Sequence, residues 1–373
     1  MELHTILVTG GAGFVGSHLV DALVERGHRV RILDALVDQV HGEGAPKHLN
    51  PGAEFLQADI ADRAALDRAM EGVEVVFHHA AEVGVGQSMY QIERYVRANS
   101  LGTAALLEAL VERRGRIRKL VVAASMSAYG EGAYDCPNCG VVTPPLRPVA
   151  QLLERRWEVD CPKCGSPTKP IPTAEAKPLF PTSVYAITKQ DQEQLCLTVG
   201  RAYDIPTVAL RYFNIYGPRQ ALSNPYTGVC AIFCSRLLND QQPIVYEDGE
   251  QTRDFVHVSD IVQANLLALE TDAADYQALN VGTGVGSSIL QIARLLASGL
   301  GKEIEAEVVG KYREGDIRHC VADIARARAL LGYAPKVALR QGMPDLLQWV
   351  AEQHATDRGR EAAHELEARQ LIR

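Results

Sequence analysis

The sequence predicts a doubly wound, parallel α/β sheet with a smaller C-terminal lobe. Short apolar runs alternate with helical stretches through the first half of the 373 residues, and a glycine-rich turn follows the first run. After Tyr216 the rhythm changes to short apolar pieces divided by Gly and Pro turns. Strand and helix alternation is typical of a parallel sheet covered by helices. We therefore expect an α/β domain at 1–213, a lobe at 214–350 whose segment 253–268 returns to the first domain, and a charged helix or tail at 351–373.

The elements of the first domain can be placed in order along the chain. A buried strand at 6–8 is followed by a turn and by a helix at 17–26, on which Leu19 and Leu23 recur at helical spacing. A second strand follows at 29–33. The later strands are expected at 54–59, 73–78, 119–124 and 207–211, and the later helices at 63–70, 91–113 and 185–203.

The turn after the first strand is a dinucleotide-binding fingerprint. Gly10 allows a tight turn, Gly13 lets backbone N–H groups approach a pyrophosphate, and Gly16 permits close packing of helix on strand. Asp34 ends the second strand, where its carboxylate can accept a hydrogen bond from a ribose 2′-OH and repels a 2′-phosphate. The pattern therefore predicts NAD rather than NADP. The residues expected to form the turn are Gly10, Gly13, Phe14, Val15 and Gly16.

Composition excludes some classes of function. The 38 basic and 46 acidic side chains give a net charge of −8, which argues against general affinity for nucleic acid or an anionic membrane. No apolar run approaches the length of a membrane span, and the first strand leaves no room for a signal peptide, so we expect a cytoplasmic protein. Four of the eight cysteines are expected to be buried thiols: Cys196, Cys230, Cys234 and Cys320.

A tyrosine and a lysine at Tyr185 and Lys189 lie four residues apart, on one face of a helix. Together with the glycine-rich turn, with Ser125 at the end of a strand and with Asn99, this pair resembles the extended short-chain dehydrogenase/reductase family, in its nucleotide-sugar epimerase/dehydratase branch. The resemblance covers about residues 3–350, apart from one insertion. It implies a Rossmann-type first domain, tightly bound NAD and a nucleotide-sugar substrate.

The resemblance assigns catalysis to Ser125, Tyr185 and Lys189. A free tyrosine with a pKa near 10 is a poor base, and we expect the Lys189 ammonium and the nicotinamide cation to favour its phenolate. Tyr185 can then remove a proton from a sugar hydroxyl while the adjacent C–H gives hydride to NAD, with the Ser125 hydroxyl on the same oxygen. We also expect Lys189 to hold the nicotinamide ribose.

The resemblance implies further binding residues in both parts of the chain. Those expected at the cofactor, besides the turn, are Asp34, Asp59, Ile60, Ala80, Ala81, Asn99, Tyr185, Lys189 and Tyr212. Those expected at the substrate are Ser127, Asn214, Arg219, Arg253, Arg313 and Asp316. Guanidinium groups suit the diphosphate of such a substrate, because they form charge-assisted hydrogen bonds.

The residues after Ser125 favour epimerisation. Related dehydratases carry an Asp-Glu pair there, whereas this chain has Met126 and Ser127, which cannot act as a general acid or base at neutral pH. A 4-epimerase needs only removal of hydride, rotation of the ketone and return of hydride to the other face. A net 4-ketoreductase or a dehydratase stays open as an alternative, as does a non-catalytic NAD-binding regulator.

The sugar is indicated only by resemblance. The strings at 83–90, 223–228 and 315–320 are similar to bacterial 4-epimerases that convert dTDP-L-rhamnose to dTDP-6-deoxy-L-talose. Met89 and Tyr226 are able to line an apolar wall beside a methyl group, or to be core residues. UDP-glucose or UDP-glucuronate 4-epimerisation is the alternative within the enzyme class.

An insertion at 133–170 carries two CPxCG units and predicts a zinc ribbon. Four thiolates at this spacing suit a tetrahedral, structural Zn²⁺ with no open position. The predicted ligands are Cys136, Cys139, Cys161 and Cys164. Because the insertion joins the elements that carry Ser125 and Tyr185, we expect it at the mouth of the active site, as a lid, a subunit contact or a partner site. Its arginines, Arg147 among them, are expected mainly on a solvated face.

The resemblance also implies a homodimer. Members of the family pair through the helix after Asn99 and the helix of Tyr185, which together form a four-helix bundle. No function is assigned to the charged segment at 351–373, which is typical of a solvated terminal helix.

Overall fold

The computed structural model describes residues 2–42, 44 and 46–373. Its centre is a seven-stranded parallel sheet in the order β13-β9-β5-β4-β1-β2-β3. The strands are β1 (Thr5–Thr9), β2 (Arg29–Asp34), β3 (Glu54–Gln57), β4 (Val75–His78), β5 (Lys119–Ser125), β9 (Thr207–Tyr212) and β13 (Gln277–Val281). The order reverses beside β1, so a crevice lies at the carboxyl ends of the strands. The predicted Rossmann-like α/β sheet is confirmed.

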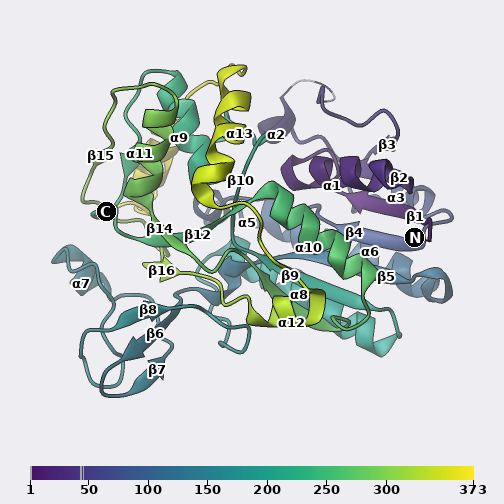
Figure 1. Cartoon of the computed structure of the whole chain (residues 1–373), viewed down its shortest axis with the longest axis horizontal. Coiled ribbons are helices and arrows are strands. Elements are labelled where there is room, and N and C mark those ends of the chain that lie inside the picture. The colour runs from purple at the N-terminus through teal and green to yellow at the C-terminus, as the bar shows by residue number, and fades with distance from the viewer. Residues whose placement is uncertain (1, 43, 45) are drawn as a thin grey trace.

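Helices cover both faces of this sheet (Figure 1). They are α1 (Phe14–Glu25), α10 (Val258–Glu270) and α12 (Ala325–Leu331) on one face, and α3 (Arg63–Ala69), α6 (Gly102–Glu112) and α8 (Val184–Ala202) on the other. The alternation of side chains along β1 sends Ile6 and Val8 into the first core and Leu7 into the second. Among the residues that the structure describes, no helix has both the length and the apolar character to cross a bilayer.

The helix expected at 91–113 is divided into three parts. A short α5 (Ile92–Tyr95) leads into a π-helical stretch η1 (Val96–Leu101), and α6 begins at Gly102. A π-helical turn adds a residue to the local repeat and is frequent at functional sites. Here it turns Asn99 fully inward, so the interruption sets the direction of a buried amide.

The smaller lobe packs around its own core, which includes Phe233, Leu296 and Leu346. Its strands are β10 (Asn214–Tyr216), β11 (Ile244–Val245), β12 (Thr252–His257), β14 (Gly286–Ser288), β15 (Glu307–Val308) and β16 (His319–Cys320). Its helices are α9 (Val229–Leu238), α11 (Ile289–Gly299), α13 (Leu339–Ala351) and α14 (Gly359–Ala368). The chain leaves the lobe to supply α10 and β13 to the main sheet domain, so the two parts are interleaved.

The insertion folds as a separate small unit, seen at the lower left of Figure 1. Its three antiparallel strands are in the order β7-β6-β8, with β6 (Ala133–Cys136), β7 (Gly140–Val142) and β8 (Lys169–Ile171), and α7 (Val149–Leu153) follows β7. A core of only a few residues, Tyr134, Val142 and Val159 among them, lies beside the cysteines. So small a core needs a further cross-link to be stable.

Candidate active site

A cavity of about 700 Å³ lies at the carboxyl ends of the parallel strands, between the sheet domain and the lobe. This is where a doubly wound sheet binds its ligand. The predicted residues that line it are Gly10, Gly13, Phe14, Val15, Gly16, Asp34, Asp59, Ile60, Ala80, Ala81, Ser125, Ser127, Tyr185, Lys189, Tyr212, Asn214, Arg253, Arg313 and Asp316. The predicted site is thus brought together in one space, with Asn99 and Arg219 outside its lining.

The glycine turn has the shape that a bound pyrophosphate requires. Gly10 has φ +68°, and a Cβ there would come 2.7 Å from the amide nitrogen of Ala80. A Cβ on Gly16 would overlap the carbonyl oxygen of Gly10. Gly13 caps α1 without a side-chain hydrogen bond, so the first N–H groups of the helix are open to an anion. The turn therefore fits a dinucleotide.

The second strand presents a carboxylate to the ribose end of this cavity. Asp34 accepts hydrogen bonds from the backbone N–H groups of Ala12, at 3.0 Å, and Leu36, at 2.9 Å. His41 lies 3.7 Å from the same carboxylate, and burial lowers the pKa of its imidazole. A 2′-phosphate would meet a fixed negative charge and a neutral imidazole there, so the donor set fits NAD.

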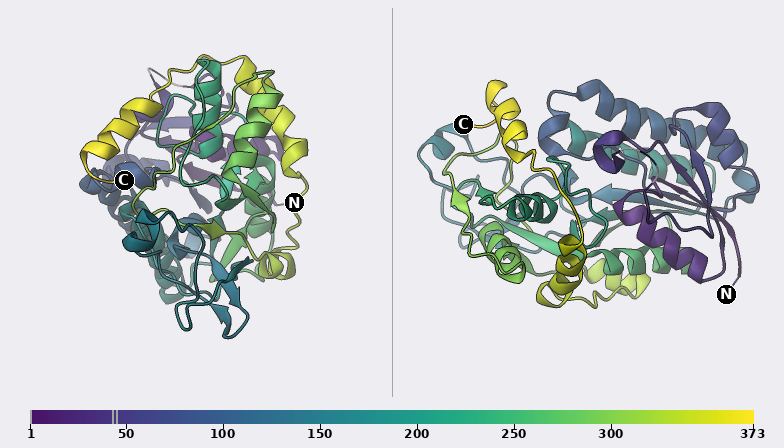
Figure 2. Two further views of the ribbon diagram at one scale, coloured as in Figure 1. Left: turned by 90° about the vertical axis from the view of Figure 1, so that its left-hand side faces the viewer. Right: turned by 90° about the horizontal axis from the view of Figure 1, so that it is seen from above.

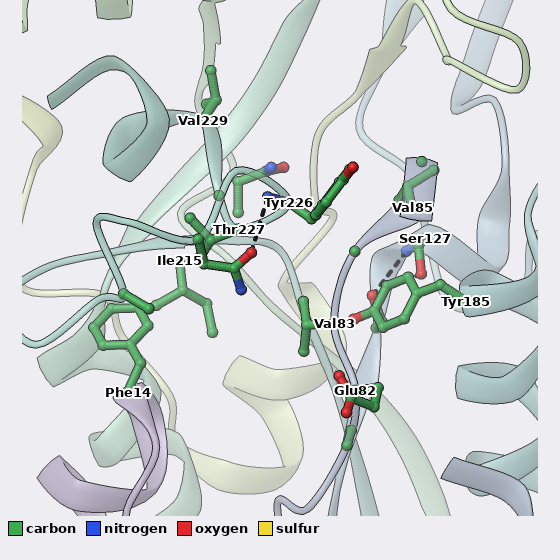
Figure 3. A pocket seen from close by; sticks show the side chains of 18 of the residues that line it. Phe14, Glu82, Val83, Val85, Ser127, Tyr185, Ile215, Tyr226, Thr227 and Val229 are labelled. Carbon is green, nitrogen blue, oxygen red and sulfur yellow. Dashed lines mark hydrogen bonds between the residues drawn. The ribbon is translucent and has the colours of Figure 1, made fainter. Parts of the chain in front are cut away.

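Tyr185 and Ser125 converge from neighbouring elements. Ser125 ends β5, and Tyr185 lies in the first turn of α8, where its N–H donates to the Ser88 hydroxyl at 3.0 Å. The Ser127 hydroxyl donates to the Ser125 oxygen at 2.9 Å. Figure 3 shows Tyr185 and Ser127 facing the same space as Val83. A sugar hydroxyl in this space can meet both a phenol and a serine.

Tyr185 and Lys189 are both buried, and the Lys189 ammonium is hydrogen-bonded to another side chain. Burial raises the pKa of Tyr185, and the Ser125 hydroxyl acts in the opposite direction. The Lys189 ammonium donates to the Gln192 side chain at 2.7 Å, and burial lowers the pKa of this lysine to about 8. The phenolate of Tyr185 thus needs a further positive charge in the cavity, which fits an oxidised nicotinamide.

Asn99 lies behind the wall of the cavity. Its amide oxygen accepts from the Glu82 N–H at 2.7 Å, and its amide nitrogen donates to the Glu82 carbonyl at 3.1 Å and to the Thr188 hydroxyl at 2.9 Å. Asn99 therefore positions the segment of Glu82 and α8 instead of facing a ligand. Arg219 has φ +69° and pairs with Asp21 at 2.7 Å, away from the cavity lining.

The lobe brings guanidinium groups to the other end of the cavity. Arg253 donates to the carbonyl oxygens of Ile317, at 2.7 Å, and Arg318, at 2.9 Å. Arg313 stacks over the Tyr246 ring at 4.7 Å and pairs with Asp316 at 2.8 Å. This end can neutralise a diphosphate.

Three charged lining residues, Arg236, Glu82 and Glu314, were not selected from the sequence. Arg236, on α9, is 1% exposed and pairs with Asp357 at 3.0 Å, while its second terminal nitrogen has no partner among the described residues. Its guanidinium interrupts the apolar run of α9, which was the available signal. Glu82 lines the cavity beside Tyr185 (Figure 3) and pairs with Arg94 at 2.9 Å. The sequence around Glu82 carries no such signal, because this residue lies in the loop after β4, where no periodic pattern applies.

The four predicted zinc ligands form one cluster. Their sulfur atoms lie within 4.8 Å of one another, and those of Cys136 and Cys164 are 3.6 Å apart. Tetrahedral zinc with bonds of about 2.3 Å places its sulfurs about 3.8 Å apart. The donor set therefore fits zinc. The other four cysteines are buried thiols, as predicted.

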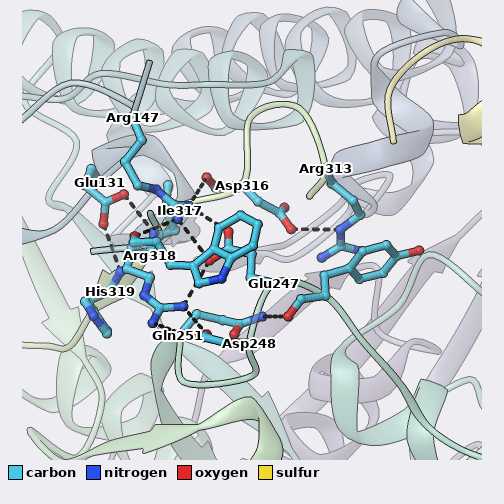
Figure 4. Close-up of polar contacts among 12 residues, drawn as sticks. Glu131, Arg147, Glu247, Asp248, Gln251, Arg313, Asp316, Ile317, Arg318 and His319 are labelled. Atoms are coloured by element: carbon cyan, nitrogen blue, oxygen red, sulfur yellow. Dashed lines mark hydrogen bonds and ion pairs between the residues drawn. The ribbon is translucent and has the colours of Figure 1, made fainter. Parts of the chain in front are cut away.

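The prediction that the insertion lies at the mouth of the active site is wrong, because no residue of 133–170 lines the cavity. The insertion contacts the lobe instead, through the buried ion pair of Arg147 with Glu247 (Figure 4). Arg147 is 2% exposed, against the expected solvated face, and donates to both oxygens of Glu247 at 2.9 and 2.8 Å. It also donates to the carbonyl oxygens of Trp157, at 2.9 Å, and Asp316, at 3.3 Å. A partner 100 residues away in sequence thus buries this charge.

Comparison with known proteins agrees with this geometry. The model of the NAD dependent epimerase/dehydratase family matches residues 6–151 and 163–282. The chain is 36% identical, over 93% of its length and 95% of the relative, to a dTDP-L-rhamnose 4-epimerase of Burkholderia thailandensis. Among solved structures, UDP-glucose 4-epimerase of Thermotoga maritima with UDP-glucose has a TM-score of 0.76 at 32% identity, covering 93% of this chain and 99% of that one.

A second solved structure contains the cofactor. UDP-glucuronic acid 4-epimerase of Bacillus cereus, in complex with UDP-glucuronic acid and NAD, has a TM-score of 0.75 at 28% identity and covers 93% of this chain and 99% of that one. These relatives confirm the predicted class of NAD-dependent nucleotide-sugar 4-epimerases. The chain belongs to the NAD-dependent epimerase/dehydratase family.

Proposed function

We propose that this chain catalyses the NAD-dependent 4-epimerisation of a nucleotide-activated 6-deoxyhexose, dTDP-L-rhamnose to dTDP-6-deoxy-L-talose. One observation supports the reaction above all. Ser125, Tyr185 and Lys189 line the same cavity as the glycine-rich turn, while Met126 and Ser127 occupy the places of the acid and base that a dehydratase needs. The site thus has residues that can support oxidation of the sugar, but it lacks the acid and base that elimination requires.

The residues have separate tasks in this reaction. Tyr185 removes the proton of the sugar 4-hydroxyl, and the Ser125 hydroxyl hydrogen-bonds to the same oxygen. Lys189 holds the nicotinamide ribose, and the turn from Gly10 to Gly16 holds the pyrophosphate. When bound by these residues, NAD would supply the acceptor for the C4 hydride and its donor to the opposite face of the ring. Tyr185 then gives the proton back to the oxygen.

The charges at the catalytic end favour a neutral sugar. Glu82 contributes a carboxylate to the lining beside Tyr185, and the lining arginines, Arg236, Arg253 and Arg313, come from the lobe. A glucuronate carboxylate near Glu82 would find no arginine in that part of the lining, because the Arg94 guanidinium is paired with Glu82 at 2.9 Å and is not among the lining residues. Glu82 is itself held by Arg94, so it is not a free acid for elimination.

Apolar side chains favour a sugar that lacks a hydroxyl. Val83, Val85, Met89 and Tyr226 line the cavity, and Figure 3 shows Val83 and the Tyr185 ring directed to the same space. A methyl group at C6 gains by contact with such a wall, whereas a hydroxymethyl group loses hydrogen bonds to water. The 36% identical relative that is named for dTDP-L-rhamnose supports the same choice.

The ribbon holds one structural zinc ion in this proposal, on Cys136, Cys139, Cys161 and Cys164. Metal analysis of the purified chain is expected to give one zinc per chain. Cys136→Ser should lose it, while Cys196→Ser, at a buried thiol far from the cluster in sequence, should keep it. Equal zinc content in both variants would contradict the assignment.

The chain pairs as a homodimer through α5, η1, α6 and α8. Apolar side chains on these elements are exposed in the single chain: Val96 by 42%, Leu101 by 52% and Ile187 by 53%. A contact between two copies would cover them. Light scattering at micromolar concentration is expected to give the mass of a dimer, and Ile187→Glu is expected to give a monomer.

The decisive experiment is incubation of the purified chain, without added cofactor, with dTDP-L-rhamnose, UDP-glucose or UDP-glucuronate. The configuration at C4 is followed by NMR. Conversion of dTDP-L-rhamnose alone supports the full proposal, and conversion of UDP-glucose alone keeps the reaction but replaces the sugar. If none is converted even with added NAD, the proposed activity is wrong, and a ketoreductase or an NAD-binding regulator takes its place.

A further inference from the structure

The charged C-terminal segment, expected to be a solvated helix, forms part of the cavity wall. Gly359, Ala362, Ala363 and Leu366 of α14, and Leu371 after it, belong to the lining. Ala362 and Leu366 are only 7% and 6% exposed. In Figure 2 this helix, in yellow, lies where the lobe meets the parallel-sheet domain. It therefore covers the junction at which the substrate must enter.

The Glu365 carboxylate of α14 is hydrogen-bonded to two tyrosines outside this helix. Glu365 accepts hydrogen bonds from the phenols of Tyr90, at 2.6 Å, and Tyr226, at 2.8 Å, and these two phenols lie 2.6 Å from each other. The hydrogen bonds hold the pKa of Glu365 below its usual range, so it stays ionised at neutral pH. The Arg369 guanidinium lies 4.1 Å from the centre of the Tyr90 ring.

The end of the chain is fastened to the lobe. Tyr312 and Arg373 exchange backbone hydrogen bonds at 2.9 and 3.0 Å, and the Glu314 N–H donates to the Leu371 carbonyl at 2.9 Å. This short antiparallel pairing brackets Arg313, the predicted phosphate ligand. The helix thus spans the cavity between two separate attachments.

The inner face of the helix is apolar where it approaches the catalytic end. Leu366 packs on Gly86, since a Cβ on that glycine would lie 3.3 Å from both Leu366 methyl groups. Gly86 and the preceding Val85 line the same cavity as Tyr185. A larger residue at position 86 would push the helix away.

We propose that α14 is the closing wall of the sugar subsite, and that Leu366 selects a sugar carbon without a hydroxyl. This inference rests on the proposed function and names the residues of its sugar selectivity. A hydroxyl against Leu366 would lose its hydrogen bonds to water and find no partner on this face, which corresponds to roughly tenfold to hundredfold selectivity. The Glu365 contacts keep the wall closed while the ketone is present.

The test compares Leu366→Ser, Glu365→Ala and the control Glu361→Ala, whose side chain is exposed on the same helix. The substrates are dTDP-L-rhamnose and dTDP-glucose, which has a hydroxyl on C6. We expect Leu366→Ser to reduce the ratio of the two kcat/KM values about tenfold, with unchanged affinity for dTDP and unchanged bound NAD. The control should keep the wild-type ratio.

Glu365→Ala gives a second readout, which does not depend on the identity of the sugar. Loosening the wall lets the oxidised 4-keto nucleotide sugar escape, so that its hydride remains on the cofactor and its proton leaves through Tyr185. We expect KM to rise several-fold and reduced cofactor to accumulate during turnover, measured by its absorbance. A wild-type ratio in Leu366→Ser would overturn the selectivity, and absence of reduced cofactor in Glu365→Ala would overturn the closure. Failure of the proposed reaction would differ, as the wild-type chain would then convert neither nucleotide sugar, and failure of the proposed sugar would show as conversion of dTDP-glucose but not of dTDP-L-rhamnose by the wild-type chain.

Discussion

Replacement of Arg147 by methionine tests whether the ribbon supports the substrate site. The Arg147 side chain is 2% exposed and the side chain of its partner Glu247 is 3% exposed. Loss of one member of a buried pair costs about 3–5 kcal/mol, because the remaining charge is left without compensation. Arg318 still contacts Glu247 at 3.0 Å, so we expect the lower end, about 3 kcal/mol.

The assay is thermal unfolding, with a matched surface variant. At about 2.1 cal/mol/K of unfolding entropy per residue, a loss of about 3 kcal/mol lowers the melting temperature of a chain of this length by about 4 °C. Arg156→Met removes ion pairs from a side chain that is 57% exposed, in the same ribbon, and should cost less than about 1 kcal/mol. The double variant Arg147→Met/Glu247→Gln should recover part of the loss, since no unpaired charge remains.

Arg147→Met also has a kinetic consequence. Its guanidinium holds the Asp316 carbonyl, and Asp316 pairs with Arg313 in the cavity. We expect a several-fold rise in KM for the nucleotide sugar with unchanged bound NAD. If Arg147→Met has the same melting temperature as Arg156→Met and the KM of the wild type, the ribbon does not support the substrate site and the argument is refuted.

Three further predictions concern the cofactor and the catalytic residues. Gly16→Ala should purify without NAD, because the added Cβ would overlap the Gly10 carbonyl oxygen. The control Gly115→Ala, at a glycine with open space around it, should keep the cofactor. Equal NAD content in the two variants would argue against the pyrophosphate-binding turn. Tyr185→Phe should slow epimerisation by about 10²–10⁴-fold and leave dTDP affinity unchanged, measured by NMR and calorimetry; near-normal turnover would remove Tyr185 as the base. Burial lowers the pKa of Lys189 to about 8, so the folded chain binds fewer protons than the unfolded chain between about pH 8 and 10.5. Stability should therefore rise by about 3 kcal/mol across that range relative to Lys189→Met, and parallel melting profiles would contradict the burial of a charged lysine.

The parts of the site that could be predicted are those in which local sequence determines geometry. A glycine-rich turn between a strand and a helix has a backbone conformation that its sequence largely determines. Tyr185 and Lys189 share a helix face because they are four residues apart, whatever packs around them. Most of the predicted contacts therefore line one cavity. Asn99 differs, because it lies in a π-helical stretch that the sequence pattern does not reveal, and its amide bonds the Glu82 backbone and the Thr188 hydroxyl behind the cavity lining.

The parts that could not be predicted depend on partners far away in sequence. The sequence around Arg147 predicts a surface residue, and only its pairing with the distant Glu247 accounts for its burial. The sequence of α14 predicts a solvated helix, because only a short stripe with Ala362 and Leu366 is buried. The burial of these side chains depends on how two elements that are distant in sequence pack against each other. A charged or small residue carries no periodic signal of its own.

Ribbon and C-terminal segment act on the same piece of chain. The segment 313–318 carries Arg313 and Asp316, and the family model matches nothing beyond residue 282. On one side the chain end pairs with its backbone at residues 312 and 314, and on the other side Arg147 holds the Asp316 carbonyl. Because both elements fix the same loop, loosening either should change how tightly the nucleotide sugar is held while the oxidation step on Tyr185 stays intact. We therefore expect the residues of the parallel-sheet domain to determine the chemistry, and these two elements to affect how tightly the nucleotide sugar is bound.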